Sequence, residues 1–340
     1  MRVLKVVSIL FIMLALVAGS VFARGHGDVT RINVSHPQTD QHPWHHGAIA
    51  FANYINANSD GRFDVSVFPN SGLSQGNAAL MVEQVQAGTL HIAIESLTVL
   101  AAFNDRPSIL QLPFTFSDRD HVSRFVQLRD PVWEGFMGEF ERSNFIILGS
   151  SPRPMRQLNN NVRMIRTPAD MEGLRMRVPM NPFFVSIFET LGASPVAAPP
   201  HEIYMGIQLG TFAGEDNSIP NQYDFRIFEV AQNFSVVNYI ADLSFIFINS
   251  DFYRNLNDAD RRLFHAAGQE FVRVEQHEIE AHYALAMAEG HRLGVDFWVM
   301  PPENKQLFVD RLAPFFEQFS RSYTPAEWTA FHEAVRRSAP

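Results

Sequence analysis

Two arginines and one asparagine have the side-chain chemistry best suited to binding a small anion. Arg156 lies in the segment MRQL, Arg177 in LRMRVP, and Asn217 closes the segment GEDN. A guanidinium group presents a planar fork of donors that matches a carboxylate, which gives both strength and orientation. Asn217 offers a donor and an acceptor for other polar groups of a ligand. We therefore predict that these three side chains close over the carboxylate of a small organic acid.

The place of Arg177 in its predicted strand supports this role. Apolar residues alternate with arginines from 174 to 178, which predicts a strand with one apolar face, and Pro179 ends it. Ligands of α/β sheets bind beyond the C-terminal ends of the strands, where Arg177 would lie. The competing interpretations are a solvated strand arginine at this position and an ordinary turn residue at Asn217.

A short strand is predicted at 212–214, and it places Glu215, Asp216 and Asn217 at its C-terminal end. Asp216 therefore joins the candidate ligand residues. The two neighbouring carboxylates fit a polar strand end better than an acid–base pair for catalysis.

The N-terminal part of the sequence predicts a second group of polar residues at strand ends. Strands are expected at 30–35, 62–69 and 90–94, with helices at about 42–58 and 77–87 between them. This β-α-β-α-β order predicts a mostly parallel sheet covered by helices. Candidates by position at its C-terminal edge are Ser35, His36, Glu95 and Ser96. Ordinary polar loop residues are an equally good explanation of these four.

Two histidine patterns were weighed as metal sites. His42 and His46 are one helical turn apart in the cluster that also holds His36 and His45, but no carboxylate falls at a matching position nearby. We interpret this cluster as a polar helix start. His277 and His282 are five residues apart, which turns them to different faces of a helix and excludes a zinc-protease motif. We expect no metal and no cofactor.

Composition narrows the class of protein. The 340 residues suit two domains, and 46% of them are hydrophobic, as in a globular fold. The net charge of −9 argues against nucleic acid, and the absence of cysteine excludes disulfides and thiolate sites. No nucleophile elbow, phosphate loop or dinucleotide fingerprint is present, so we do not expect an enzyme.

The remaining elements are predicted from periodicity, caps and breakers. A strand at 144–149 precedes the expected domain boundary, and Thr167-Pro168 begins a single helical turn. Helices are expected at 182–191, 202–209, 225–232, about 258–290, 303–319 and from 324 onward; strands are expected at 234–237 and 243–248. Residues 1–23 have a basic start and an apolar run and end with the small residue Ala23, after which cleavage is expected. This pattern predicts an export signal.

Several segments, in order, resemble the DctP-type substrate-binding proteins of TRAP (tripartite ATP-independent periplasmic) transporters. They are HPWHHGAIAFANYI, VFPNSGL, VEQVQAGTLHIAI, LQLPFTF, MRQL, TPADMEGLRMRVP, LGASPV, HEIYMGIQLGTFAGEDN and, more loosely, FRIFEV, from about residue 30 to about 325. The resemblance implies an α/β fold of two domains that close like a venus flytrap, with a long helix spanning both. Domain I would comprise 24–153 plus about 243–282, and domain II 154–242 plus about 283–330.

The resemblance also implies roles for individual residues. Arg177 would form the principal salt bridge with the ligand carboxylate, and Arg156 would support the ligand or the domain interface. The sequence departs from the family at Glu215-Asp216, where Gln-Glu is usual, so an added negative charge could alter selectivity. Pro200 replaces a frequent phenylalanine, and Ser218 replaces a usual proline.

The expected function is therefore that of a periplasmic receptor. It would act as a monomer, bind a small carboxylate and deliver it to the small and large membrane subunits of a TRAP transporter. The alternatives are a receptor for an ATP-driven importer or a signalling system, and a secreted enzyme. Sugar acids, dicarboxylates, sialic acid-like and aromatic acids all remain open as ligands.

Overall fold

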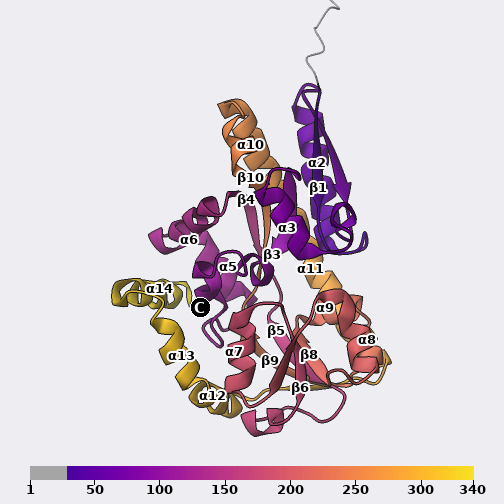
Figure 1. Ribbon diagram of the computed structural model, residues 1–340, viewed down its shortest axis with the longest axis vertical. Coiled ribbons are helices and arrows are strands. Elements are labelled where there is room, and N and C mark those ends of the chain that lie inside the picture. Colours follow the sequence, from indigo (N-terminus) through magenta and orange to yellow (C-terminus); the bar gives the residue numbers. More distant parts are fainter. Residues whose placement is uncertain (1–28) are drawn as a thin grey trace, which may run out of the picture.

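Two β-sheets form the framework of the chain (Figure 1). The computed structural model describes residues 29–340, so the predicted export signal at 1–23 lies outside the described residues. The first sheet has the order β2 (Phe63–Phe68), β1 (Thr30–Ser35), β3 (Ile92–Ser96), β10 (Leu243–Asn249), β4 (Phe145–Pro152). The second has the order β11 (Asp296–Val299), β9 (Asn233–Ile240), β5 (Arg156–Asn160), β8 (Gly214–Asn217), β6 (Arg175–Val178), β7 (Ser194–Ala197).

Helices cover both sheets. Those that precede the second sheet are α2 (Pro43–Asn58), α3 (Ala78–Gln86), α4 (Leu97–Leu100), α5 (Arg119–Gln127) and α6 (Pro131–Arg142). The others are α7 (Pro182–Thr190), α8 (Ile203–Gln208), α9 (Ile219–Asp224), α10 (Ser250–Arg254), α11 (Asp258–Arg292), α12 (Pro302–Arg311), α13 (Ala313–Ser320) and α14 (Pro325–Ser338).

The first sheet combines parallel strands from the start of the chain with a later strand that runs antiparallel to its neighbours. β1 pairs in parallel with β2 and β3, as the β-α-β-α-β pattern predicted. β10 then runs antiparallel between β3 and β4. Its side chains alternate between two cores, with Ile246 packed in the core that includes α2 and α11, and Phe245 in the core that includes α3. Because both faces are covered, every residue of the strand is buried, and the run from Phe245 to Ile248 is entirely apolar.

The second sheet brings together the strands that carry the candidate ligand residues. β5 lies antiparallel to β8, with Leu158 opposite Asp216, and β6 lies parallel to β8, with Arg177 opposite Glu215. β8 is therefore flanked by both arginine-bearing strands. The order along the sheet, rather than the order along the chain, makes these residues neighbours.

The helix α11 links the two halves of the molecule, as Figure 1 shows in orange. It packs against α2 and β4 beside the first sheet and against α9 beside the second. Asn257 caps its N-terminus by accepting a hydrogen bond from Asp260 N. The backbone of α11 approaches β4 so closely at Gly268 that an added Cβ would lie 2.3 Å from the carbonyl oxygen of Leu148. The predicted long helix and the mixed α/β class are confirmed.

The three C-terminal helices return the chain to the first half. α12 and α13 run beside the second sheet, and α14 packs against α5 and α6 (Figure 1, yellow). The capping box at Thr324 and Glu327 begins α14 as predicted. Among residues 29–340, no helix is both long and apolar enough to cross a membrane.

Several predicted element boundaries were wrong. The helix expected at 225–232 is only a short 3₁₀ turn, Ile227–Glu229, because Arg226 adopts a left-handed φ of 60°. The helix expected at 303–319 is two helices, since Pro314 cannot continue the hydrogen bonding of α12. The strand expected at 212–214 begins at Gly214 instead and contains Asn217. Six helices and strands had no prediction: α4, α6, α9, α10, β7 and β11.

The close approach at Gly268 gives a stability prediction. The substitution Gly268→Ala forces a methyl group against the β4 backbone, and we expect a loss of about 1–3 kcal/mol in the free energy of unfolding. Gly135→Ala is the matched control, because Gly135 is exposed on α6 with nothing within 4 Å of an added Cβ. It should gain about 0.5–1 kcal/mol from helix propensity. Urea unfolding measures both, and equal stabilities of the two variants would contradict the packing argument.

Candidate ligand-binding site

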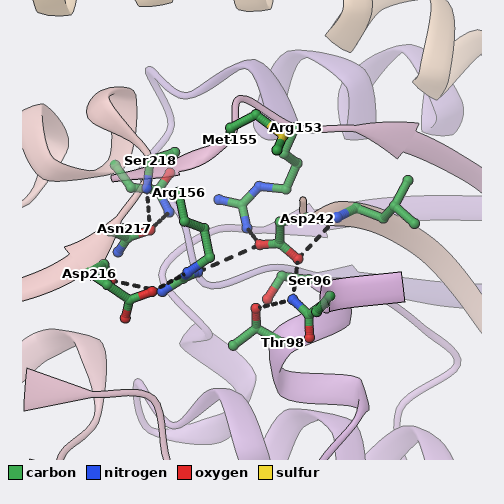
Figure 2. A network of polar contacts seen from close by, with 12 residues as sticks. Ser96, Thr98, Arg153, Met155, Arg156, Asp216, Asn217, Ser218 and Asp242 are labelled. Atoms are coloured by element: carbon green, nitrogen blue, oxygen red, sulfur yellow. Dashed lines mark hydrogen bonds and ion pairs between the residues drawn. The ribbon is translucent and has the colours of Figure 1, made fainter. Parts of the chain in front are cut away.

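Arg156 is anchored on the second sheet by Asp216 on the neighbouring strand. Its Nε donates to Asp216 Oδ2 at 2.6 Å and its Nη2 donates to the Asp216 carbonyl at 2.8 Å (Figure 2). Tyr239 donates its hydroxyl to the same Oδ2 at 2.7 Å, and the guanidinium lies 5.0 Å from the ring centre of Phe184. Burial opposes the charge on Arg156, but the Asp216 carboxylate outweighs it, so the pKa of Arg156 is raised. The arginine is thus held by an ion pair, by a hydrogen bond to a backbone carbonyl and by its contact with an aromatic ring.

Arg177 is equally buried but is held less completely. Its side chain is 3% exposed, its Nε donates to the Ala198 carbonyl at 2.8 Å, and its Nη1 lies 3.3 Å from Glu215 Oε2. Within residues 29–340 its Nη2 makes no hydrogen bond. Burial lowers the pKa of Arg177, and Glu215 opposes that shift. One edge of this guanidinium therefore keeps donor capacity for an incoming acceptor.

Glu215 is the carboxylate that faces Arg177, and it is itself incompletely satisfied. It is fully buried, and its Oε1 has no hydrogen-bond partner among the described residues. Burial raises the pKa of Glu215 to about 7, although Arg177 favours the ionised form. From the sequence, Glu215 was predicted as a polar residue at a strand end and as a departure from the family pattern, but not as a partner of Arg177. The pairing with Arg177 joins residues far apart in the chain, so no local signal marked it.

A chain of charges connects this site to the first sheet. Asp242 Oδ2 accepts from Arg153 Nη1 at 2.6 Å and lies 3.7 Å from Arg156 Nη1, so it stands between the two arginines (Figure 2). Gln111 donates to Asp242 Oδ1 at 3.2 Å and to Thr98 Oγ1 at 2.8 Å. Sequence reasoning missed Arg153, Gln111 and Asp242. The prolines on both sides of Arg153 marked a crossover, but nothing in the sequence indicated its partner.

Glu95 and Ser96 lie on the first-sheet side of the network. Glu95 Oε1 accepts from the backbone N and the hydroxyl of Ser96 at 2.7 and 3.1 Å, whereas its Oε2 has no partner within residues 29–340. Burial raises the pKa of Glu95 to about 7, and the charges that act on it are those of Arg153 and Asp242. The two positional candidates are therefore part of the same charged region as Arg156.

Asn217 is 5% exposed at the end of β8, where α9 begins. Its Oδ1 accepts from Ser218 N at 3.0 Å and from Asn221 Nδ2 at 3.1 Å, which fixes the orientation of the carboxamide. Gln222, one residue further along α9, is fully buried, and neither atom of its amide has a hydrogen-bond partner among the described residues. Buried amides are normally paired, so Gln222 is a further candidate for ligand contact that the sequence did not suggest.

The histidine cluster lies on the Arg153 side of the network, where the Arg153 guanidinium is 4.9 Å from the ring centre of Trp44. His36 Nε2 lies 3.1 Å from His45 Nδ1, and burial lowers the pKa of His36 to about 3. His42 caps α2 by accepting from Trp44 N, which confirms the interpretation as a polar helix start. His46 pairs with Glu278 of α11, a carboxylate remote in sequence. Within residues 29–340 no group of three or more ligating side chains could hold a metal ion.

Two hollows in the protein surface lie apart from these arginines. One, of about 180 Å³, is lined by residues that include Arg119, Gln157 and Tyr283. The other, of about 310 Å³, is lined by residues that include Asn181 and Phe319. Neither lining includes Arg156 or Arg177. The candidate site is identified by its buried, partly unpaired polar groups.

Two helix-covered sheets joined by a long helix carry the buried arginines of the candidate site. The chain belongs to the bacterial extracellular solute-binding proteins of family 7 (DctP), whose sequence model matches residues 34–322. This confirms the resemblance on which the family expectation was based.

Three similar proteins illustrate the match. The C4-dicarboxylate-binding periplasmic protein DctP of Vibrio cholerae is 28% identical over 298 residues, which cover 85% of this chain and 86% of the relative. A TRAP periplasmic solute-binding protein of Anaerococcus prevotii, solved with bound D-glucuronate, has a TM-score of 0.84 at 24% identity. The alignment covers 91% of this chain and 98% of that one. A similar fold is seen in the protein of Polaromonas bound to D-erythronate, with a TM-score of 0.82 at 21% identity and coverage of 89% and 98%.

The raised pKa of Glu95 predicts a pH-dependent stability. Folded Glu95 keeps its proton to about pH 7, whereas its ordinary pKa is 4.5, so the native state binds more protons between these values. The free energy of unfolding must therefore fall as pH rises through this range, by up to about 3 kcal/mol from this group. Glu95→Gln removes that loss, so the free energy of unfolding of the variant should rise relative to that of the wild type between pH 4.5 and pH 8.

Urea unfolding at several pH values measures this difference. Glu83→Gln on α3 serves as the control, because Glu83 is exposed. Its difference from the wild type should not change with pH. A Glu95→Gln difference that is also constant across the range would show that Glu95 is ionised in the folded protein throughout.

Proposed function

We propose that this protein is a periplasmic receptor that binds a small organic acid between its two sheets and delivers it to the small and large membrane subunits of a TRAP transporter. The observation that carries the proposal is the buried guanidinium of Arg177, which retains an unpaired edge beside the anchored Arg156. A buried cation with free donors favours an anionic partner. Membership of the extracellular solute-binding proteins of family 7 supports the same role.

In this proposal each candidate residue has a distinct task. Arg177 binds the ligand carboxylate, while Arg156, held by Asp216, supplies positive potential and supports the interface between the sheets. Asn217 presents its amide to polar groups of the ligand. Glu95 and Ser96 form the opposite wall, where a carboxylate and a hydroxyl would accept hydrogen bonds from ligand hydroxyls. His36 pairs with His45 and is a more distant part of that wall.

The ligand class follows from the chemistry and from related proteins. Relatives are named for C4-dicarboxylates, and solved neighbours hold D-glucuronate or D-erythronate. All of these combine a carboxylate with further polar groups. A small polar carboxylate is therefore the proposed class of ligand, and the receptor would bind it as a monomer without a metal or cofactor.

Ligand entry requires the two walls to separate, because direct contacts hold them together. Asn181, which precedes α7 beside the second sheet, donates to the Thr98 carbonyl of α4 at 3.1 Å. The Arg156–Asp242 contact at 3.7 Å joins β5 to the connection between β9 and β10, where the chain passes from the second sheet to the first. These contacts would be broken on opening and remade on closure, as in hinge-type receptors. We propose the two sheets with their helices as the moving units, with boundaries as predicted from the sequence.

The alternative is a receptor for an ATP-driven importer or for a signalling system. Uptake of radiolabelled ligand into proteoliposomes separates these possibilities. With TRAP membrane subunits from the source genome, uptake should require this receptor and an ion gradient but no ATP. Uptake that needs ATP, or no uptake despite tight ligand binding, would favour the alternative.

Removal of the central guanidinium tests the binding role directly. Arg177→Ala leaves both the ligand carboxylate and Glu215 without their partner, and we expect binding to weaken by about 3–5 kcal/mol, or more than a hundredfold. The measurement is isothermal titration calorimetry with the acid that gives the largest thermal shift in a panel of sugar acids and dicarboxylates.

Arg175→Ala is the matched control, because Arg175 lies on the same strand but is exposed to solvent. Its affinity should stay within threefold of the wild type. Equal affinities of the Arg177→Ala variant and the wild type would remove Arg177 from the site.

A further inference from the structure

The candidate site contains more buried carboxyl groups than guanidinium groups, which does not favour a purely anionic ligand. Three guanidinium groups face four carboxyl groups, and all seven side chains are at most 5% exposed: Arg153, Arg156, Arg177, Glu95, Glu215, Asp216 and Asp242. Above pH 7, where Glu95 and Glu215 lose the protons that burial favours, the set carries one more negative than positive charge before any ligand binds. Buried charges without partners are costly, so a purely anionic ligand would add to an existing excess.

The local contacts at Arg177 sharpen this imbalance. Glu215 already occupies one terminal nitrogen of the guanidinium, at 3.3 Å. A ligand carboxylate on the other terminal nitrogen would place two carboxylates on one cation. Glu215 is affected by the charges of Arg177, Asp216 and Arg156 and by a hydrogen bond from Asn217. The other cation in this group, Arg156, is already paired with Asp216, so it is not free to offset the added negative charge.

The unpaired carboxylate oxygens on β8 indicate which kind of group the ligand must supply. Glu215 Oε1 and Asp216 Oδ1 are buried acceptors without a partner among residues 29–340. A buried acceptor left without a donor costs free energy, and a charged one costs more than a neutral one. A cationic donor on the ligand would satisfy such an oxygen and offset the charge of the ligand's own carboxylate in one contact.

We infer that the ligand is zwitterionic, with an ammonium-type cation beside its carboxylate, and that Glu215 selects it. This rests on the proposed function, since it requires the ligand carboxylate to bind Arg177. Because Glu215 and the ligand carboxylate occupy neighbouring nitrogens of one guanidinium, the cation belongs on the carbon next to the carboxylate. Amino acids and cyclic imino acids have this arrangement, whereas sugar acids carry a hydroxyl there.

A competing route would let a plain anion bind. Glu215 could take up a proton on binding and donate it in a hydrogen bond to the ligand, since burial already raises its pKa to about 7. This route predicts an affinity for plain acids that weakens as pH rises above 7, with uptake of about one proton per ligand. The zwitterion route predicts binding without proton uptake at pH 8.

Calorimetric titrations at pH 8 with matched ligand pairs test the inference. The pairs are lactate and alanine, glycerate and serine, D-erythronate and 2-amino-3,4-dihydroxybutanoate, and tetrahydrofuran-2-carboxylate and proline. For at least one pair the wild type should bind the amino or imino acid at least tenfold more tightly. Repeating the titrations in buffers of different ionisation enthalpy gives the number of protons taken up.

Three variants assign the preference to Glu215. Glu215→Gln keeps the size and removes the charge, so the preference should fall at least tenfold; Glu215→Asp keeps the charge and should retain the direction of preference. Glu172→Gln, at an exposed position, is the control and should behave as the wild type. Circular dichroism melting curves verify that each variant is folded.

The outcomes separate this inference from the function on which it rests. Tighter binding of the hydroxy acids, proton uptake near one, or an unchanged preference in Glu215→Gln overturns the zwitterion inference alone. Absence of binding by every amino acid and every carboxylic acid tested overturns the proposed receptor function as well.

Discussion

The buried ion pair between Arg156 and Asp216 is the constraint to which the site geometry is tied. A guanidinium at 4% exposure is tolerable only when its donors are filled, and here a carboxylate, a backbone carbonyl and an aromatic face do so. These partners exist only if β5 and β8 lie side by side. Gly214 allows that approach, because a Cβ there would lie 1.9 Å from the carbonyl oxygen of Asn159. The pair therefore fixes both strand order and side-chain placement.

The same charges lie where the chain passes between the sheets. Arg153 follows β4 and precedes β5, while Asp242 lies in the short connection from β9 to β10. Their backbones are joined by Arg153 N donating to the Asp242 carbonyl at 3.0 Å, and their side chains by the ion pair at 2.6 Å. Any rotation about these crossovers moves Asp242 relative to Arg156. The Arg153–Asp242 pair therefore places charges of the candidate site at the two connections between the sheets.

Local chemistry made much of the fold predictable. Alternation gave β1 and β2, a nearly continuous apolar run gave β10, and side-chain caps gave the starts of α11 and α14. Arg226 and Pro314 show where such reasoning fails, because one left-handed residue or one missing donor ends a helix whose apolar spacing otherwise continues. The return of β10 between β3 and β4 is a pairing across distant segments, which no local pattern encodes.

The types of residue in the candidate site were predictable from the sequence, but the pairing of their charges was not. Strand-end position and side-chain type singled out Arg177 and Asn217, whereas the partners of each charge depend on sheet order. Arg177 meets Glu215 only because β6 and β8 are neighbours, and this contact changes what the arginine can bind. A lone buried guanidinium would favour any carboxylate. A guanidinium that already shares a carboxylate favours a ligand that brings its own positive charge, so selectivity here depends on the second charge of the ligand more than on the first.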